Sequence, residues 1–297
     1  MNATQHLTGI LLVAAFAVVG CSKHEDTAKK ADPPASPPAK AAAVQPTVGK
    51  PFDDEGFVAT PPKAVSLPIT YADGEAAYHA GKYSDARTIF EGYVGAHPKH
   101  AFGHYMLGLS SWKANDLIGA EKAFKDALAI DPKHVKSLVN LSRVLIEGKK
   151  YDDAVDMLTK AGDLDPKSSD VQRLLGRAYH SQKMLEDAES AYRAAINLDE
   201  KDAWSLNNLG LVLLEQKRAA DAVPFLTKAV ELKNDVPVFH NNLGMALEHT
   251  GQFKAAAKAY DGAVTADPFY EKAKQNLARV SEIKTDGDEP DATIAKK

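Results

Sequence analysis

The sequence lacks the features that mark most enzymes and most nucleic-acid-binding proteins. It has one cysteine, few aromatic residues (7%) and a nearly balanced formal charge of −4. A single cysteine excludes a disulfide within the chain, and a balanced charge does not supply the basic stripe that nucleic acids usually require. There is no HExxH, GxSxG or CxxC motif and no glycine-rich phosphate loop. We therefore expect a protein that is not an enzyme, with no catalytic residue, no cofactor and no nucleic-acid partner.

The chain also lacks an apolar run long enough to span a bilayer, which takes about 20 residues. The run at 7–19 is shorter than this and has the length of a signal-peptide core, and it leads into VVGC. This ending resembles the bacterial lipobox, in which the cysteine is lipidated and becomes the first residue of the mature protein. The resemblance implies a lipoprotein signal peptide at 1–20 and a lipid on Cys21. Residues 1–6 contain no Lys or Arg, so a conventional secretion signal with an incidental cysteine is the alternative.

Proline is concentrated in the segment that follows the cysteine. Nine of the sixteen prolines lie between residues 22 and 68, among many alanines and balanced charges. This composition predicts that 21–66 is a disordered linker that holds the rest of the chain away from the lipid. Ser22 follows the cysteine, which in enteric-type bacteria implies sorting to the outer membrane. We expect a lipid-anchored protein of the bacterial cell envelope, at the outer membrane and facing the periplasm, with the anchor as its only membrane contact.

What the sequence does contain is a strict internal repeat. Six windows of equal length follow one another without insertion: 67–100, 101–134, 135–168, 169–202, 203–236 and 237–270. The twentieth residue is alanine in all six windows, and the eighth is glycine in five of them and serine in the other. Position 24 is Phe, Tyr or Leu throughout, and position 32 is proline in four windows.

A period of 34 with this pattern resembles the tetratricopeptide repeat (TPR), a helix–turn–helix unit. The resemblance covers 67–270 and implies an all-α fold, a right-handed solenoid of six repeats. Positions 4, 7, 8 and 11 recur at helical spacing and predict one packing face on each first helix. Glycine at position 8 and alanine at position 20 would let the two helices approach closely. Turn signals fall in mid-window at Gly81, Asn115, Gly148 and Gly251.

The chain after the last window carries a narrow apolar stripe. Tyr270, Ala273, Leu277 and Val280 form this stripe among polar residues. We predict that 271–284 is a capping helix, because the end of a repeat array otherwise exposes a hydrophobic surface to solvent. Residues 285–297 are charged and poor in hydrophobic side chains, which predicts a disordered tail.

Asparagines gather on the side of the first helices that lies opposite the predicted packing face, at positions 2, 5, 6, 9, 12 and 13. In TPR proteins this is the inner, concave face, which commonly grips an extended peptide or a partner helix. An asparagine there suits a peptide backbone, because its amide offers both a donor and an acceptor. The asparagines at positions 5 and 6 are Asn140, Asn207, Asn208, Asn241 and Asn242. This row resembles the inner face of O-GlcNAc transferases; the alternative is that these residues belong to the repeat consensus and bind nothing.

Two further groups on this side are candidates for partner binding. Arg143, Arg173 and Arg177 fall at positions 9, 5 and 9 and predict a basic site for a carboxylate, a partial match to the carboxylate clamp of chaperone-binding TPR proteins. Tyr105 and Trp112 predict an aromatic wall near the N-terminal end, where rings would anchor a partner. The alternative is that these rings pack against the incoming linker.

One histidine group has a spacing that suits a metal. It consists of His97, His100 and His104, in AHPKHAFGHYML. However, His104 occupies a packing position, and His97 precedes a proline in a loop. We therefore expect structural or surface histidines and no metal site.

These features predict a non-catalytic TPR scaffold that recruits protein or peptide partners to the bacterial envelope. The architecture resembles that of TPR lipoproteins that assist pilus, secretion or outer-membrane assembly. The alternative is an accessory or regulatory subunit of an envelope enzyme that acts on glycan or peptidoglycan.

Overall fold

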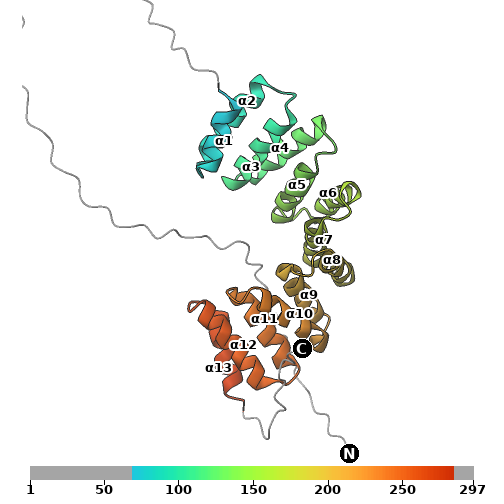
Figure 1. Ribbon diagram of the computed structural model, residues 1–297, viewed down its shortest axis with the longest axis vertical. Coiled ribbons are helices and arrows are strands. Elements are labelled where there is room, and N and C mark those ends of the chain that lie inside the picture. Colours follow the sequence, from blue (N-terminus) through green and yellow to red (C-terminus); the bar gives the residue numbers. More distant parts are fainter. Residues whose placement is uncertain (1–68, 284–297) are drawn as a thin grey trace, which may run out of the picture. The chain divides into compact units, whose positions relative to one another are not determined.

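The computed structural model describes residues 69–283, and every regular element in this range is an α-helix. The helices are α1 (Tyr71–His79), α2 (Tyr83–Ala96), α3 (Ala101–Lys113), α4 (Leu117–Ile130), α5 (Val135–Glu147), α6 (Tyr151–Leu164), α7 (Ser169–Ser181), α8 (Leu185–Leu198), α9 (Ala203–Glu215), α10 (Ala219–Leu232), α11 (Pro237–His249), α12 (Phe253–Ala266) and α13 (Glu271–Ser281). They pack in pairs that stack in chain order (Figure 1). The predicted all-α fold of repeated helix pairs is confirmed.

The helices keep the period of the sequence. From α3 onward, each first helix begins at the residue that opens its window, and each second helix begins at position 17 of its window. The turn between them has a fixed position too: the fifteenth residue of all six windows has a left-handed φ of 60–79°. At Gly148 the sequence signal is one residue off, because Gly148 has a φ of −76° and Lys149 takes the left-handed conformation.

Small residues let the two helices of a repeat approach closely. Gly108 faces Phe124 and Gly176 faces Tyr192, and a methyl group on either glycine would lie within 2.7 Å of the facing ring. The alanines at position 20 are all fully buried: Ala86, Ala120, Ala154, Ala188, Ala222 and Ala256. The large residue at position 24 therefore fills the space that these small side chains leave, which gives the tight packing expected of a protein core.

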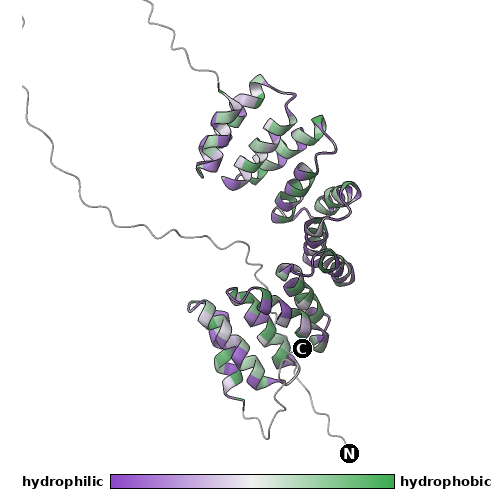
Figure 2. Ribbon diagram, viewed as in Figure 1, coloured by the Kyte–Doolittle hydropathy of each residue, from purple (hydrophilic) through white to green (hydrophobic). Residues whose placement is uncertain are grey.

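Successive repeats share one interior. Each second helix packs against the first helix of the next repeat as well as against its own partner. One cluster of buried hydrophobic residues runs from α2 to α7, and three smaller clusters continue it toward α13. Figure 2 shows the result, with hydrophobic and hydrophilic residues on different sides of the same helices.

The last helix of the described range, α13, lies on α12 in the place of a seventh first helix. Ala273 and Val280 of the predicted stripe are buried against it, while Gln275 and Ala278 are exposed. The helix ends at Ser281, earlier than the predicted boundary at 284.

No helix between residues 69 and 283 is long and apolar enough to cross a membrane. Four predictions lie outside the described residues: the signal peptide at 1–20, the lipid on Cys21, the linker at 21–66 and the tail at 285–297. They stay predictions.

Candidate partner-binding surface

The asparagines predicted to face a partner are for the most part buried. Asn241 is fully buried, and only 2% of Asn207 and 4% of Asn242 is exposed. The expectation that positions 5 and 6 lie on a side that does not pack is therefore wrong. The reason is geometric: successive first helices lie next to one another, so these positions meet the neighbouring repeat. Asn140 and Asn208 are the two that remain half-buried.

The buried asparagines hydrogen-bond to one another across repeats. Asn242 Nδ2 donates to Asn207 Oδ1 at 2.8 Å, and Asn276 Nδ2 donates to Asn241 Oδ1 at 2.9 Å. Within α9, Asn207 Nδ2 donates to Asn208 Oδ1 at 3.1 Å. The two bonds between repeats each join residues 35 positions apart, which is position 5 of one repeat and position 6 of the next. This amide ladder holds α9, α11 and α13 together.

The three predicted arginines lie in the middle of the array, on α5 and α7. Arg143 Nη2 contacts Asp170 Oδ2 at 2.5 Å, and Arg173 contacts the other oxygen of the same carboxylate. Arg173 Nε also lies 3.2 Å from Asp202 Oδ2. Two of the arginines are therefore held in place by two carboxylates, and about a quarter of each side chain is exposed.

Arg177 differs from the other two. It is half-buried, and within residues 69–283 its guanidinium has no carboxylate partner. Burial raises the pKa of the nearby Tyr192 phenol, whereas the charges of Arg177 and Arg173 and a hydrogen bond with Asn208 act to lower it. The three arginines carry three positive charges, and the carboxylates of Asp170 and Asp202 carry two negative charges. Among these five groups, one positive charge is therefore not compensated.

The predicted aromatic wall is largely part of the protein core. Only 8% of Tyr105 is exposed, and the Trp112 indole N–H donates to Glu147 Oε2 at 2.8 Å. Asn140 Nδ2 lies 3.4 Å from the Tyr105 hydroxyl oxygen, which repeats the contact between positions 5 and 6. Trp112 is half-buried, and Phe102 has 41% of its area exposed.

Positions 12 and 13 form a second set of contacts between first helices, and the pairing of these positions was not predicted from the sequence. His180 Nε2 lies 2.9 Å from Glu215 Oε1, and Lys183 Nζ lies 3.1 Å from Glu215 Oε2. Trp112 and Glu147 are the corresponding pair two repeats earlier, and both pairs are 35 residues apart. Because both pairs have this spacing, they could have been predicted by a search of the sequence for complementary residues 35 positions apart.

The three histidines weighed as metal ligands have separate partners. His97 Nδ1 lies 3.0 Å from the Tyr93 carbonyl oxygen, His104 Nε2 lies 3.0 Å from the Pro98 carbonyl oxygen, and His100 packs edge-on against Tyr93. No group of three potential metal-binding side chains occurs in the part of the chain that the structure describes.

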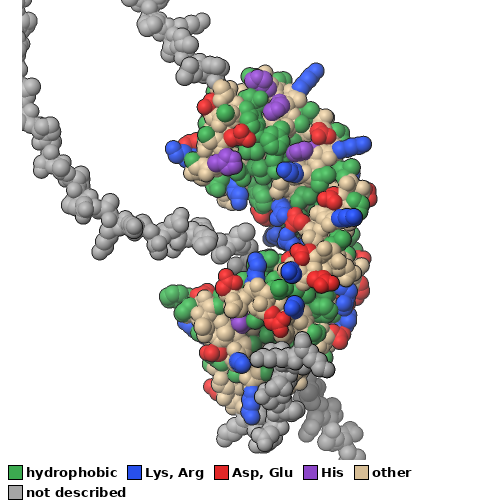
Figure 3. All heavy atoms as spheres, in the orientation of Figure 1, with side chains coloured by type: hydrophobic (Ala, Val, Ile, Leu, Met, Phe, Trp, Pro, Cys, Tyr) green, Lys and Arg blue, Asp and Glu red, His purple; other side chains and the backbone are tan. Residues whose placement is uncertain are grey.

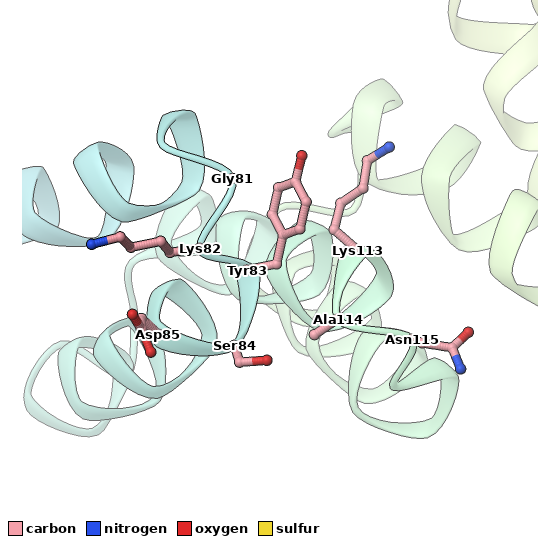
Figure 4. Close-up of a pocket in the computed structure, with 8 residues that line it drawn as sticks. All are labelled: Gly81, Lys82, Tyr83, Ser84, Asp85, Lys113, Ala114 and Asn115. Atoms are coloured by element: carbon pink, nitrogen blue, oxygen red, sulfur yellow. The ribbon is translucent and has the colours of Figure 1, made fainter. Parts of the chain in front are cut away.

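A shallow hollow of about 380 Å³ lies between the turns of the first two repeats. It is lined by Gly81–Asp85 and Lys113–Asn115 (Figure 4). In Figure 4 the Lys82 side chain points away from those of Tyr83 and Lys113, so the three present no set of groups that converges on a ligand. The first-helix surface around Arg177 is the better candidate.

Comparison with known proteins identifies the family. A family model described as the C-terminal domain of cilia and flagella-associated protein 70 matches residues 101–297, two-thirds of the chain. The chain belongs to the tetratricopeptide repeat family. The search of curated proteins finds no match. A non-catalytic scaffold for protein partners is the class of function that TPR arrays typically serve.

Solved TPR structures resemble the chain over most of their own length. The MamA protein is 26% identical, with a TM-score of 0.51 over 59% of this chain and 94% of that one. YrrB, described as a TPR protein with an unusual peptide-binding site, is 18% identical, with a TM-score of 0.51 over 63% and 96%. The pilF protein of Pseudomonas aeruginosa is 17% identical, with a TM-score of 0.61 over 70% and 95%. The last two likenesses show the TPR fold alone.

Proposed function

We propose that the protein is a non-catalytic TPR scaffold that binds an acidic segment of a protein partner on the first helices of its middle repeats. The observation that carries this proposal is the guanidinium of Arg177, which has no carboxylate partner within residues 69–283. A half-buried charge without a partner is unfavourable, and a carboxylate from another chain would relieve it. Arginine suits this role because its planar guanidinium binds a carboxylate through two parallel hydrogen bonds.

The surroundings of Arg177 favour an extended peptide over a lone anion. Asn140 and Asn208 are half-buried on the neighbouring first helices, α5 and α9. Their amides offer hydrogen bonds to a peptide backbone on either side of the charged contact. Asp170 and Asp202 hold Arg143 and Arg173 in fixed positions, so less side-chain entropy is lost when a partner binds.

A displayed library of random peptides, selected on the full purified chain, tests the proposal. We expect selected peptides to be enriched in Asp and Glu, and Arg177→Ala to abolish that enrichment. For a selected peptide, a hydrogen-bonded charge contact of about 1.5–3 kcal/mol predicts that Arg177→Ala weakens binding roughly 10- to 100-fold. Lys160→Ala, which removes an exposed lysine from second helix α6, is the matched control and should leave binding unchanged. Equal enrichment on the Arg177→Ala chain would place the binding site elsewhere.

We further propose that the scaffold works in the bacterial envelope, anchored by a lipid on Cys21, in the assembly of pili, secretion systems or the outer membrane. The support is the lipobox-like sequence before Cys21 and the proline-rich segment between the cysteine and the repeats. Two acyl chains anchor a protein to a membrane stably, whereas one does not.

Cys21→Ser tests the anchor. We expect the variant to keep its helical circular dichroism and to leave the membrane fraction. If it stays with the membranes after a salt wash, an uncleaved signal or a bound partner replaces the lipid as the explanation. The identity of a partner crosslinked to the wild-type chain in the envelope then separates an assembly role from that of an accessory subunit of a wall enzyme.

A further inference from the structure

A comparison with the preceding repeat explains why Arg177 has no carboxylate partner within residues 69–283. In that repeat, Arg143 Nη2 of α5 lies 2.5 Å from Asp170 Oδ2, and Asp170 is the second residue of the next first helix, α7. One repeat later, the equivalent residues are Arg177 of α7 and Trp204, the second residue of α9. The chain therefore has an aromatic ring where the preceding repeat has the acid that neutralises its arginine.

Trp204 presents an exposed aromatic surface at this place. Its ring meets the buried Phe239 ring edge-on, with centroids 4.9 Å apart, and Lys233 Nζ lies 5.9 Å from its centre. These contacts fix the orientation of the indole, yet 43% of the residue is exposed. Tryptophans that become buried when a partner binds are among the largest contributors to binding energy. The exposed part of Trp204 is therefore suited to an apolar side chain of a partner.

The start of α9 and Arg177 share one electrostatic environment. Asp202 accepts a hydrogen bond from the backbone N–H of Trp204 at 3.1 Å, which caps α9. Burial raises the pKa of the Tyr192 phenol; the charge of Arg177 lowers it and the charge of Asp202 raises it. Both charges therefore lie within reach of the same hydroxyl group, which agrees with the position that repeat equivalence gives Arg177 and Trp204.

The apolar surface continues along the first helices. Leu211 of α9 and Met245 of α11 hold the position that Arg143 and Arg177 hold on α5 and α7, and both are half-buried. Successive first helices contact one another, so these four residues form a row. Figure 3 shows basic and acidic side chains close together where α5 meets α7. The row thus changes from basic to apolar between α7 and α9.

We propose that the partner's acidic residue is accompanied by an apolar side chain, which Trp204 and Leu211 bind while Arg177 binds the carboxylate. This inference rests on the proposed function and extends its site from α7 to α9. The axes of packed helices lie about 8–10 Å apart, and an extended peptide advances about 3.3 Å per residue. The acidic and apolar residues of the partner should therefore be about two to four residues apart.

A displayed library of random peptides, selected on the full purified chain, tests this pairing. On the wild-type chain we expect enriched acids to be accompanied by Leu, Ile, Phe or Trp at that spacing. On the Trp204→Ala chain the acids should stay enriched and the apolar residue should not. Phe102→Ala is the matched control, because Phe102 is also the second residue of a first helix and is 41% exposed. It should keep both preferences.

Trp204→Asp restores the acid that the preceding repeat has at this position. The new carboxylate should pair with Arg177 as Asp170 pairs with Arg143, so the acids and the apolar residue should both lose their enrichment. The pairing has a readout of its own. In urea, Arg177→Ala should lower the free energy of unfolding more in the Trp204→Asp chain than in the wild type, because only there does it break an ion pair. Equal losses in the two chains would overturn the equivalence of the two positions.

Fluorescence anisotropy with one selected peptide measures the apolar contact. Trp204→Ala should weaken the parent peptide roughly 5- to 30-fold. It should hardly affect a peptide whose apolar residue is replaced by Ala, because both changes remove one contact. The Ala peptide should also bind the wild-type chain more weakly than the parent, which tests the contact even if a change at Trp204 disturbs folding.

Two outcomes separate this inference from the proposed function. Acids enriched on the wild-type chain without an accompanying apolar residue would overturn the inference and leave the acidic-peptide site at Arg177 in place. A wild-type selection without enriched acids would overturn both.

Discussion

At the scale of single residues, the most informative side chains are asparagines that were predicted to lie on a helix face free of packing contacts and that are buried instead. Asn207, Asn241 and Asn242 recur at a spacing that a binding surface would also produce. Their burial depends on how closely one first helix lies to the next, which is a property of packing that a helical projection of one repeat does not contain. The same geometry puts Tyr105 in the core and leaves Phe102 at the surface.

The amide ladder predicts that Asn242→Ala destabilises the protein. The change removes the donor that satisfies Asn207 Oδ1 and leaves that buried acceptor without it. An unsatisfied buried polar group costs about 1–3 kcal/mol, so the free energy of unfolding in urea should fall by that amount. Asn234→Ala, at an exposed position, should change it by less than about 0.5 kcal/mol. A loss no larger than that of the control would show that the ladder does not contribute to stability.

At the scale of elements, helix lengths and packing pairs were predictable, because they follow from a strict period. Positions 8, 20 and 24 are distinctive enough in residue type to identify the close approach of the two helices from the sequence alone. Contacts between repeats were not predictable in this way. Several of them join residues 29 or 35 positions apart, as in Glu121 with Lys150 or His180 with Glu215, and such distant pairs are not visible in the helical pattern of a single repeat.

One such contact has a pH dependence. Glu121 accepts hydrogen bonds from Lys125 at 2.7 Å and from Lys150 at 2.8 Å, and these lysines lower the pKa of its carboxyl group. The folded pKa lies below the unfolded value of about 4.3, so the stabilisation is complete above that pH. It is lost as the pH falls through the lower, folded pKa.

We therefore expect Glu121→Gln to lower the melting temperature at pH 7, where each pair is worth about 0.2–1 kcal/mol. The difference from wild type should shrink as the pH falls through the folded pKa. Glu186→Gln neutralises an exposed acid of α8 and should show no such convergence. A Glu121→Gln difference that stays constant on acidification would mean that side-chain packing, rather than charge, explains it.

At the scale of the whole molecule, stability in a stack of repeats is a sum of neighbouring interfaces, and an end repeat has one interface fewer. At the C-terminal end α13 supplies the missing one. Val280 is 2% exposed and belongs to the same cluster as Leu247 and Tyr260. Arg279 pairs with Glu248 of α11 across the same boundary.

Val280→Asp should therefore detach α13 and loosen the last repeat. A buried charge without a partner costs about 3–5 kcal/mol. We expect this cost to exceed the free energy that holds the terminal helix on the array. Hydrogen exchange should quicken in α12 and α13, with α3 to α6 unchanged. Ala278→Asp, two residues away on the exposed side of the same helix, should leave exchange in α12 as it is. Faster exchange along all helices would indicate that the array unfolds as a single unit.

The ion pairs between second helices and the following turn also have a consequence for folding. At the first boundary the base Arg87 of the second helix meets the acid Asp116 of the following turn. In the pairs Glu121–Lys150 and Glu189–Arg218 the acid lies on the second helix and the base lies at the following turn, so the first boundary has the opposite sense. Repeats of nearly identical shape can assemble with the wrong neighbour, a characteristic failure of repeat proteins. Here a first repeat that docks on the third would bring Arg87 to Lys150, and one that docks on the fifth would bring Arg87 to Arg218. Both errors place like charges together, so the charge of Arg87 favours docking of the first repeat on its own neighbour.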